Sequence, residues 1–223
     1  MGTKYRIGVG ICTVDCKVHQ VLPISLLNCM SGRDWSRYEF RVFTKQSIYI
    51  DANRNDVAAQ FLNDGGYDFL LFWDYDNGIT PDTFDYFMED MAKPNVHIVG
   101  GLYFMKDKNF RVTSGMRFPH TPAGRWELEC CAFAGEELVN LSRDCGSISG
   151  AVAGGMLMVR KEVFYEVPYP WFMTAWPGGV FTGEDTTFSQ RAEAAGYDLY
   201  LDPRIQSAHM SGDTSYPPEW KPW

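Results

Sequence analysis

The stretch Y-D-F-L-L-F-W-D-Y-D, residues 67–76, combines an unbroken apolar run with two carboxylates that end it. The run at residues 69–73 is typical of a strand that is buried on both faces, as in a parallel sheet. Asp74 and Asp76 cannot follow this strand into the core, because an unpaired buried charge is very unfavourable. We therefore expect both carboxylates at the carboxyl end of the strand, where open α/β sheets bind their ligands.

The D-x-D spacing of Asp74 and Asp76 suggests a metal site. A turn just past the end of a strand can bring both carboxylates to one side, and oxygen ligands suit hard cations such as Mg²⁺ or Mn²⁺. Such an ion often holds a substrate diphosphate. The alternative is a pair of solvated turn aspartates, since this spacing is common in proteins.

The segments around this run alternate between strand-like and helix-like patterns. We expect strands at residues 5–14, 38–43 and 96–104, a helix that has Pro23 in its first turn and stops near Gly32, a helix from near Asn53 or Asn55 to residues 63–66, and a helix from Thr80-Pro81 to just before Pro94. This alternation predicts βαβ units and therefore a mostly parallel sheet.

The second half is less regular. Residues 109–118 and 126–133 can pair as strands around a turn at 119–124, and residues 135–149 fit a surface loop or a short helix equally well. Residues 149–160, S-G-A-V-A-G-G-M-L-M-V-R, predict a strand preceded by small residues.

The last third ends in regular patterns again. Glu184 and Asp185 open a helix that Gly196 ends, which is a favourable placement for acids in the dipole of a helix. Residues 197–201 predict a strand, and residues 205–209 predict another. The aromatic loop before the helix holds Trp171 and Trp176, which either belong to the core or stack on a sugar ring.

The composition limits the class of protein. The chain has 223 residues and no linker, repeat or low-complexity tract, which favours one domain, residues 1–223. A net charge of −8 argues against general affinity for nucleic acid, although a local basic groove stays open. No apolar run approaches the ~20 residues that span a bilayer, and the first residues lack a signal-peptide pattern. We expect a soluble, cytoplasmic protein whose cysteines are reduced thiols.

Four features occur in one order: a strand-end D-x-D, a Gly-Gly strand, a G-E-D helix start and a late histidine. They lie in I-Y-I-D-A-N-R-N-D-V-A-A-Q-F-L, Y-D-F-L-L-F-W-D-Y-D-N, S-G-A-V-A-G-G-M-L-M-V-R-K-E-V-F and G-E-D-T-T-F-S-Q-R-A-E-A-A-G-Y-D-L-Y-L-D-P, followed by His209. In this order they resemble glycosyltransferases of the GT-A fold, family 2 and its relatives. The resemblance implies a Rossmann-like α/β domain with helices flanking the sheet. Residues 1–104 would form its nucleotide-sugar-binding half, and residues 105–223 its acceptor and catalytic half.

The resemblance assigns three residues to a metal, Mn²⁺ or Mg²⁺. Asp76 would bind the ion that bridges the donor diphosphate, Asp74 would contact the metal or the ribose, and His209 would complete the site. Taken alone, His209 is more typical of a core or surface histidine than of a metal ligand. A clear aspartate for the nucleotide base is missing, with Asp15 and Asp51 as weak candidates.

Five further residues match the substrate and catalytic positions of the family. Asp185 would be the general base and Glu184 would shape the acceptor pocket, whereas the alternative treats both as ordinary first-turn acids. Arg54 would lie near the nucleotide, or it is a solvated helix arginine. Gly154 and Gly155 would line the donor sugar and acceptor, or they form a structural bulge.

The resemblance thus implies a metal-dependent glycosyltransferase that moves a sugar from a UDP- or GDP-sugar to an acceptor hydroxyl with inversion. The alternatives are a retaining transferase of the same fold, a nucleotidyltransferase and a non-catalytic sugar-nucleotide-binding module. A nucleotidyltransferase should show a lysine-rich loop near the first strand, but Gly8 and Gly10 have no clustered basic neighbours. A saccharide, a lipid carrier, a protein and a modified DNA base all fit as acceptor. The resemblance also allows a virus- or phage-encoded protein.

Overall fold

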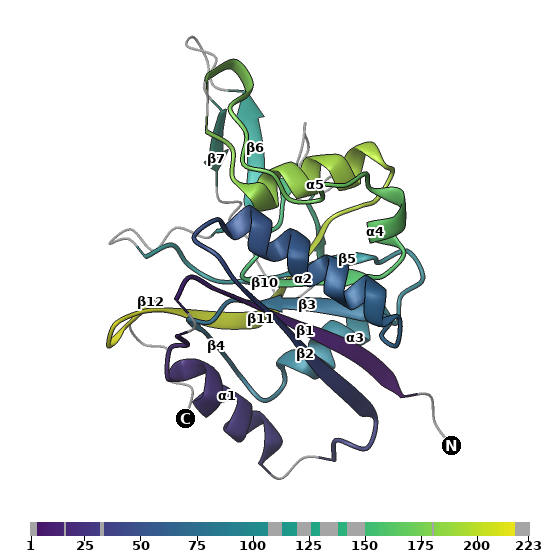
Figure 1. Cartoon of the computed structure of the whole chain (residues 1–223), viewed down its shortest axis with the longest axis vertical. Helices are drawn as coiled ribbons and strands as arrows, with labels where there is room; N and C mark the ends of the chain where they lie inside the picture. The colour runs from purple at the N-terminus through teal and green to yellow at the C-terminus, as the bar shows by residue number, and fades with distance from the viewer. Residues whose placement is uncertain are drawn as a thin grey trace.

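The computed structural model describes residues 4–15, 17–31, 34–106, 113–119, 126–129, 138–141, 150–179 and 181–216. Within these residues, a nine-stranded sheet has helices on both faces, and a three-stranded sheet lies at one end of the molecule (Figure 1). None of the helices in these ranges combines the length and the apolarity that crossing a bilayer requires.

The large sheet has the strand order β12-β11-β5-β10-β3-β1-β2, and β4 and β8 pair with β11. Its strands are β1 (Tyr5–Thr13), β2 (Tyr38–Gln46), β3 (Phe69–Trp73), β4 (Asn77–Ile79), β5 (Ile98–Leu102), β8 (Val139–Asn140), β10 (Met156–Arg160), β11 (Tyr200–Ser211) and β12 (Thr214–Tyr216). The small sheet has the order β7-β6-β9 and contains β6 (Gly115–Pro119), β7 (Trp126–Glu129) and β9 (Gly150–Ala151).

The directions of the main strands agree with the predicted mostly parallel sheet. β1 is parallel to β2 and β3, and β5 is parallel to β11. β10 is antiparallel to both β3 and β5, so it is inserted against the common direction of β2, β1, β3, β5 and β11. The central strand β3 is buried along its whole length, as its unbroken apolar run predicted.

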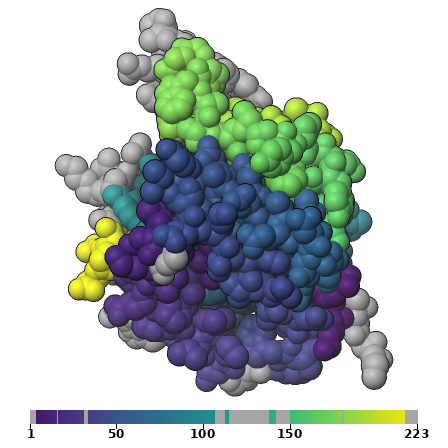
Figure 2. Space-filling view, in the orientation of Figure 1, coloured from purple at the N-terminus to yellow at the C-terminus, as the bar shows by residue number. Residues whose placement is uncertain are grey.

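Helices cover both faces of this sheet and give it two cores. They are α1 (Val21–Met30), α2 (Ile50–Asp64), α3 (Thr83–Met91), α4 (Val163–Glu166) and α5 (Glu184–Ala194), with a short 3₁₀ turn η1 (Pro177–Gly179). Leu70 and Phe72 of β3 belong to a core with residues of α2, α4 and α5, while Leu71 and Trp73 belong to one with residues of α1 and α3. The alternation follows from the two-residue period of a strand. In Figure 2, α2 lies between the green later segments and the purple first segments.

Two predicted helix starts were wrong. α2 begins at Ile50, before Asn53, and it ends as predicted at Gly65, whose φ of 72° is the left-handed conformation that glycine tolerates. α3 begins at Thr83 rather than at Thr80-Pro81. Thr83 N donates to Thr80 O at 3.2 Å, and this hydrogen bond closes a turn over residues 80–83 ahead of the helix. Pro81 therefore lies in a turn before the helix, a position that its fixed φ also suits.

The predicted separation of strands at residues 197–201 and 205–209 was also wrong. β11 is one strand that pairs with β5 through Asp202 and again at Gln206, with a register shift between them. A bulge accommodates the intervening residues without ending the strand.

The predicted pairing of the irregular middle is confirmed where the structure describes it. Residues of β6 and β7 pair in antiparallel register, although β6 extends to Pro119, which the prediction gave to the turn. The rest of the turn, and residues 135–137 and 142–149 of the predicted loop, lie outside the described residues. The prediction of a loop or short helix was wrong at Val139–Asn140, which form β8 and pair with β11.

Candidate active site

The carboxyl ends of the parallel strands β1, β2 and β3 meet at one edge of the sheet, where α/β folds place their ligands. A cavity of about 120 Å³ lies at this edge, and its wall includes residues 12–14 at the end of β1. Asp74, Asp76 and His209 all line it. The structure therefore brings the three predicted metal residues to one cavity, two of them from the turn after β3 and one from β11.

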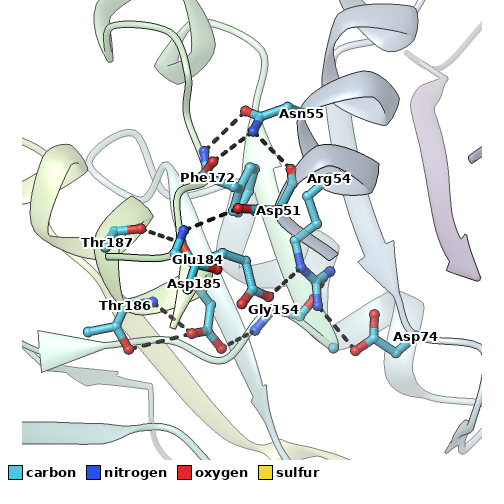
Figure 3. A network of polar contacts seen from close by, with 12 residues as sticks. Asp51, Arg54, Asn55, Asp74, Gly154, Phe172, Glu184, Asp185, Thr186 and Thr187 are labelled. Atoms are coloured by element: carbon cyan, nitrogen blue, oxygen red, sulfur yellow. Dashed lines mark hydrogen bonds and ion pairs between the residues drawn. The ribbon is translucent and has the colours of Figure 1, made fainter. Parts of the chain in front are cut away.

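Arg54 of α2 connects this edge to the start of α5 (Figure 3). Its Nη2 donates to Asp74 Oδ2 at 3.2 Å, its Nε donates to Glu184 Oε1 at 3.0 Å, and its Nη1 donates to Gly154 O at 2.9 Å. Its side chain is only 3% exposed, which excludes a solvated helix arginine. Arg54 contacts Asp74, which lines the cavity, and it directs its donors at carboxylates and backbone of its own chain. Its predicted place near the nucleotide stays a prediction.

The charge of Arg54 is stabilised by its two acidic partners. Burial by itself lowers the pKa of Arg54, because it disfavours the charged form, but attraction to Asp74 and Glu184 outweighs burial and holds the pKa well above its usual value. A buried charge is tolerated when it is paired and hydrogen-bonded in this way. The guanidinium is therefore a permanent positive charge between the strand-end aspartate and the helix-start glutamate.

Asn55, the next residue of α2, forms hydrogen bonds to the loop before α5. Its Nδ2 donates to Phe172 O at 2.7 Å, and its Oδ1 accepts from Phe172 N at 3.1 Å. Asp51 Oδ2 accepts from Thr174 N at 3.3 Å in the same loop (Figure 3). These contacts hold α2, and with it Arg54, against the segment that leads to Glu184. The hydrogen bond from Thr174 N gives the Asp51 carboxylate a partner within the protein. The sequence had offered Asp51 as a weak candidate for binding the nucleotide base.

Gly154 and Gly155 make room for this network. A Cβ on Gly154 would lie 2.7 Å from Cζ of Arg54, and a Cβ on Gly155 would lie 2.9 Å from Oδ2 of Asp74. The groups that approach these glycines are therefore side chains of the site itself. Contact of Gly154 and Gly155 with a donor sugar or acceptor stays a prediction.

Glu184 and Asp185 occupy the first turn of α5, where the helix dipole favours acids. Asp185 Oδ2 accepts from Gly154 N at 3.2 Å, and its Oδ1 accepts from Thr186 N at 2.7 Å. Burial, followed by repulsion from Glu184, raises the pKa of Asp185 above its usual value. Both acids are therefore held by specific partners, and Asp185 retains its proton more tightly than a solvated first-turn acid would.

Asp76 lies between two cationic or potentially cationic groups. Lys106 Nζ makes a very close ion pair with Asp76 Oδ2, and His209 Nε2 lies 3.7 Å from the same oxygen. Burial opposes ionisation of Asp76, but hydrogen bonds from His209 and Lys106 outweigh burial, so the pKa of Asp76 is lowered. Asp76 is therefore a carboxylate at neutral pH.

His209 is oriented as a metal ligand requires. Its Nδ1 lies 2.8 Å from Phe104 O, and because a carbonyl only accepts, Nδ1 carries the proton. Nε2 faces Asp76 Oδ2, toward which it donates when it is protonated. When Nε2 is unprotonated, its lone pair is available to a metal ion beside Asp76, which is the arrangement that second-shell bonds give to metal-binding histidines. Asp76 and His209 thus fit a divalent cation as two of its ligands.

The structure supports the complete set of three predicted metal ligands, Asp74, Asp76 and His209, less well than the pair Asp76 and His209. Among the described residues, no group of three or more His, Cys, Asp or Glu side chains is gathered closely enough to hold a metal ion. Asp74 is turned toward Arg54, and Lys106 lies against Asp76. The roles of Asp74, Asp76 and His209 in metal binding stay predictions.

Sequence reasoning missed Lys106 and Tyr103. Tyr103 is buried and its hydroxyl accepts a 2.9 Å hydrogen bond from Gly155 N, which fixes the Gly-Gly segment. The available signal was position, since Tyr103 lies near the end of the predicted strand at 96–104 and Lys106 follows that strand, toward the same sheet edge as Asp74. The open question about the aromatic loop is answered in part: Trp171 is 8% exposed and belongs to the core, whereas Trp176 is 61% exposed.

The cysteines that the structure describes are thiols rather than halves of a disulfide, as predicted. Cys12 and Cys29 are both buried, and burial raises the pKa of Cys12 to about 12. The predictions for Cys16, Cys130, Cys131 and Cys145 lie outside the described residues.

No protein-family model matches the chain, and no curated protein matches it in sequence. Its fold does resemble solved structures. The crystal structure of A197 from STIV has a TM-score of 0.62 at 16% identity and covers 95% of this chain and 91% of that one. The crystal structure of GalNAc-T7 with UDP, GalNAc and Mn²⁺ has a TM-score of 0.53 at 11% identity and covers 94% of this chain and 44% of that one. Likeness at such identities shows the fold alone, and the predicted α/β fold of the GT-A type is confirmed.

Proposed function

We propose that this protein is a metal-dependent glycosyltransferase that moves a sugar from a nucleotide diphosphate sugar to an acceptor hydroxyl with inversion. The observation that carries the proposal is the bridge from Asp74 through Arg54 to Glu184. It connects the strand-end acids on the cavity to the acids that open α5. A donor bound at the cavity would then present its sugar toward Asp185.

Asp185 is proposed as the general base. The acceptor oxygen attacks the anomeric carbon while its proton passes to the Asp185 carboxylate, and the bond from that carbon to the diphosphate oxygen breaks. Attack on the face opposite the leaving group inverts the configuration, through an oxocarbenium-like state. Hydrogen bonds from Gly154 N and Thr186 N hold the carboxylate in place without neutralising it. Its raised pKa brings its basicity closer to neutral pH, which favours proton transfer.

Asp76 and His209 Nε2 are proposed to hold the divalent cation, Mn²⁺ or Mg²⁺. When bound, such an ion stabilises the negative charge that develops on a departing diphosphate. Arg54 would hold Asp74 at the edge of the cavity, and Glu184 would shape the acceptor pocket. The neighbour GalNAc-T7, solved with UDP, GalNAc and Mn²⁺, supports trying UDP-sugars first.

The assignment of donor binding to one half of the chain and acceptor binding to the other is also a proposal. Residues 1–104 would bind the donor, since β1, β2, β3 and α2 surround the cavity. Residues 105–223 would bind the acceptor and supply the base, while His209 returns through β11 to the donor side. Cytoplasmic location, a viral or phage origin and the identity of the acceptor stay predictions.

The test is a panel of UDP- and GDP-sugars with Mn²⁺, scored for hydrolysis and for thermal stabilisation. We expect at least one sugar nucleotide to raise the melting temperature and to be hydrolysed slowly in the absence of acceptor. EDTA should abolish the hydrolysis. A panel in which no sugar nucleotide stabilises the protein or is hydrolysed would contradict the proposal. NMR of the released or transferred sugar then distinguishes inversion from retention.

A further inference from the structure

Lys106 lies just past β5, on the segment that also positions His209, and it contacts Asp76, which lines the cavity. Phe104 O holds Nδ1 of His209 at 2.8 Å, and two residues later Lys106 reaches Asp76. The Asp76 side chain is 10% exposed and that of Lys106 is 31% exposed. The ammonium is therefore partly accessible to solvent, while the carboxylate that it covers is largely enclosed.

The contact involves one particular oxygen. Oδ2 of Asp76 is the atom that faces both Lys106 Nζ and His209 Nε2. This is the place where a cation held by Asp76 and His209 would have to lie. A divalent ion at that oxygen would be within a few ångströms of the ammonium, and like charges at such distances repel strongly in a partly buried site.

We infer that the Lys106 ammonium competes with a divalent metal ion for Asp76. Once the metal ion has displaced the ammonium from Asp76, Lys106 binds the diphosphate. The inference rests on the proposed function, because it takes the cavity as a diphosphate site. It adds a residue that neither the motifs nor the comparisons indicated.

The chemistry of lysine suits this exchange. Its ammonium is a compact charge on a flexible stem of four carbons, so it can leave Asp76 without disturbing the backbone, and ammonium groups bind phosphates well as point charges. Asp76 cannot move in the same way. Met210 N donates to Asp76 O at 2.9 Å, and β4, which follows Asp76 directly, pairs with β11. Metal binding should therefore move the lysine and leave the aspartate in place.

The first experiment measures Mn²⁺ binding to the whole protein without nucleotide, by calorimetry and by the EPR signal of free Mn²⁺. We expect Lys106→Met to bind Mn²⁺ about tenfold more tightly than the unaltered protein, which is about 1.4 kcal/mol. Lys17→Met is the matched control. Lys17 follows β1 at the same sheet edge but pairs with Asp15 at 2.8 Å, so its loss should change Mn²⁺ affinity less than twofold. Equal or weaker Mn²⁺ binding by Lys106→Met would overturn the inference.

The second experiment measures binding of inorganic pyrophosphate at a Mn²⁺ concentration that saturates every variant, so that Asp76 is already occupied by the metal ion. We expect Lys106→Met to bind pyrophosphate at least fivefold more weakly than both the unaltered protein and Lys17→Met. Unchanged pyrophosphate affinity would overturn the proposed diphosphate contact. Neither readout requires turnover, so a failure here is distinct from a failure of the proposed function, which the sugar-nucleotide panel decides.

Discussion

Arg54 and Gly154 are in direct contact, and the contact requires glycine at position 154. Nη1 of Arg54 donates a 2.9 Å hydrogen bond to Gly154 O, and a Cβ at Gly154 would lie 2.7 Å from Cζ of the same guanidinium. Arg54 cannot move aside easily, since Asp74 and Glu184 hold its other nitrogens. Gly154 therefore makes room for a buried charge of the chain itself.

The first prediction is that Gly154→Ala destabilises the fold. The added methyl group overpacks a fully engaged guanidinium, and overpacking costs about 1–3 kcal/mol. Chemical denaturation measures the change in free energy of unfolding. Gly66→Ala is the control, because its Cβ would meet only a side-chain oxygen of Asp64, and it should change that free energy by less than about 0.5 kcal/mol. An equal effect of the two substitutions would refute the steric role of Gly154.

The second prediction concerns the buried ion pairs of Arg54. Arg54→Met leaves the carboxylates of Asp74 and Glu184 without their cation, and breaking a buried pair costs about 3–5 kcal/mol. Arg6→Met is the matched control: the Arg6–Asp68 pair, at 2.6 Å, has side chains 46% and 42% exposed, so its loss should lower the free energy of unfolding far less than the loss of Arg54 does. Denaturation curves of both variants at neutral pH make the comparison. Similar losses would mean that the Arg54 bridge contributes no more than a surface pair.

The third prediction tests the base. Asp185→Asn keeps the size of the side chain but cannot accept a proton, so turnover should fall about 10²–10⁴-fold, the usual contribution of a general base. Binding of the sugar nucleotide, measured by calorimetry, should change little. Because the pKa of Asp185 is raised, turnover of the unaltered protein should also rise with pH on an acid limb that begins above the ordinary carboxyl value of 3.8. Near-normal turnover of Asp185→Asn would show that another group takes the proton.

The fourth prediction concerns a carboxyl pair outside the site. Asp90 of α3 is buried beside Asp202, and burial followed by the hydrogen bond to Asp202 raises the pKa of Asp90 to about 7. Lys93 and Arg204 also face Asp90, and the interaction with Lys93 lowers this pKa without reversing the rise. The folded state then binds the proton more tightly than the unfolded state, whose carboxyl pKa is near 3.8. Stability is therefore greater at low pH and falls as pH rises from about 4 to about 7.

At about 1.4 kcal/mol per pKa unit, the change across this window is at most roughly 4 kcal/mol. Asp90→Asn should remove most of this pH dependence, because an amide hydrogen-bonds to Asp202 without titrating. Denaturation between pH 4 and pH 7.5 measures it. If the stability of Asp90→Asn still fell with pH as steeply as that of the unaltered protein, the assignment to Asp90 would be wrong.

Much of this arrangement was predictable from local sequence. The unbroken run before Asp74 can only be satisfied by burial on both faces, and the acids that follow it can only be satisfied at an edge, so both positions follow from the transfer free energies of the side chains. The glycine at position 65 and the acids of α5 likewise mark helix ends through backbone conformation and the helix dipole. These signals depend on neighbours within a few residues.

The partners of these residues depended on the tertiary structure alone. Glu184 lies 130 positions from Arg54, and Lys106 lies 30 positions from Asp76. Whether they meet depends on the insertion of β10 between β3 and β5 and on the return of β11 beside β4. Strand order is set by how the whole set of apolar faces packs, which no local pattern encodes. The sequence by itself therefore determined which charges stand at the edge of the sheet, and the packed sheet decided which of them pair.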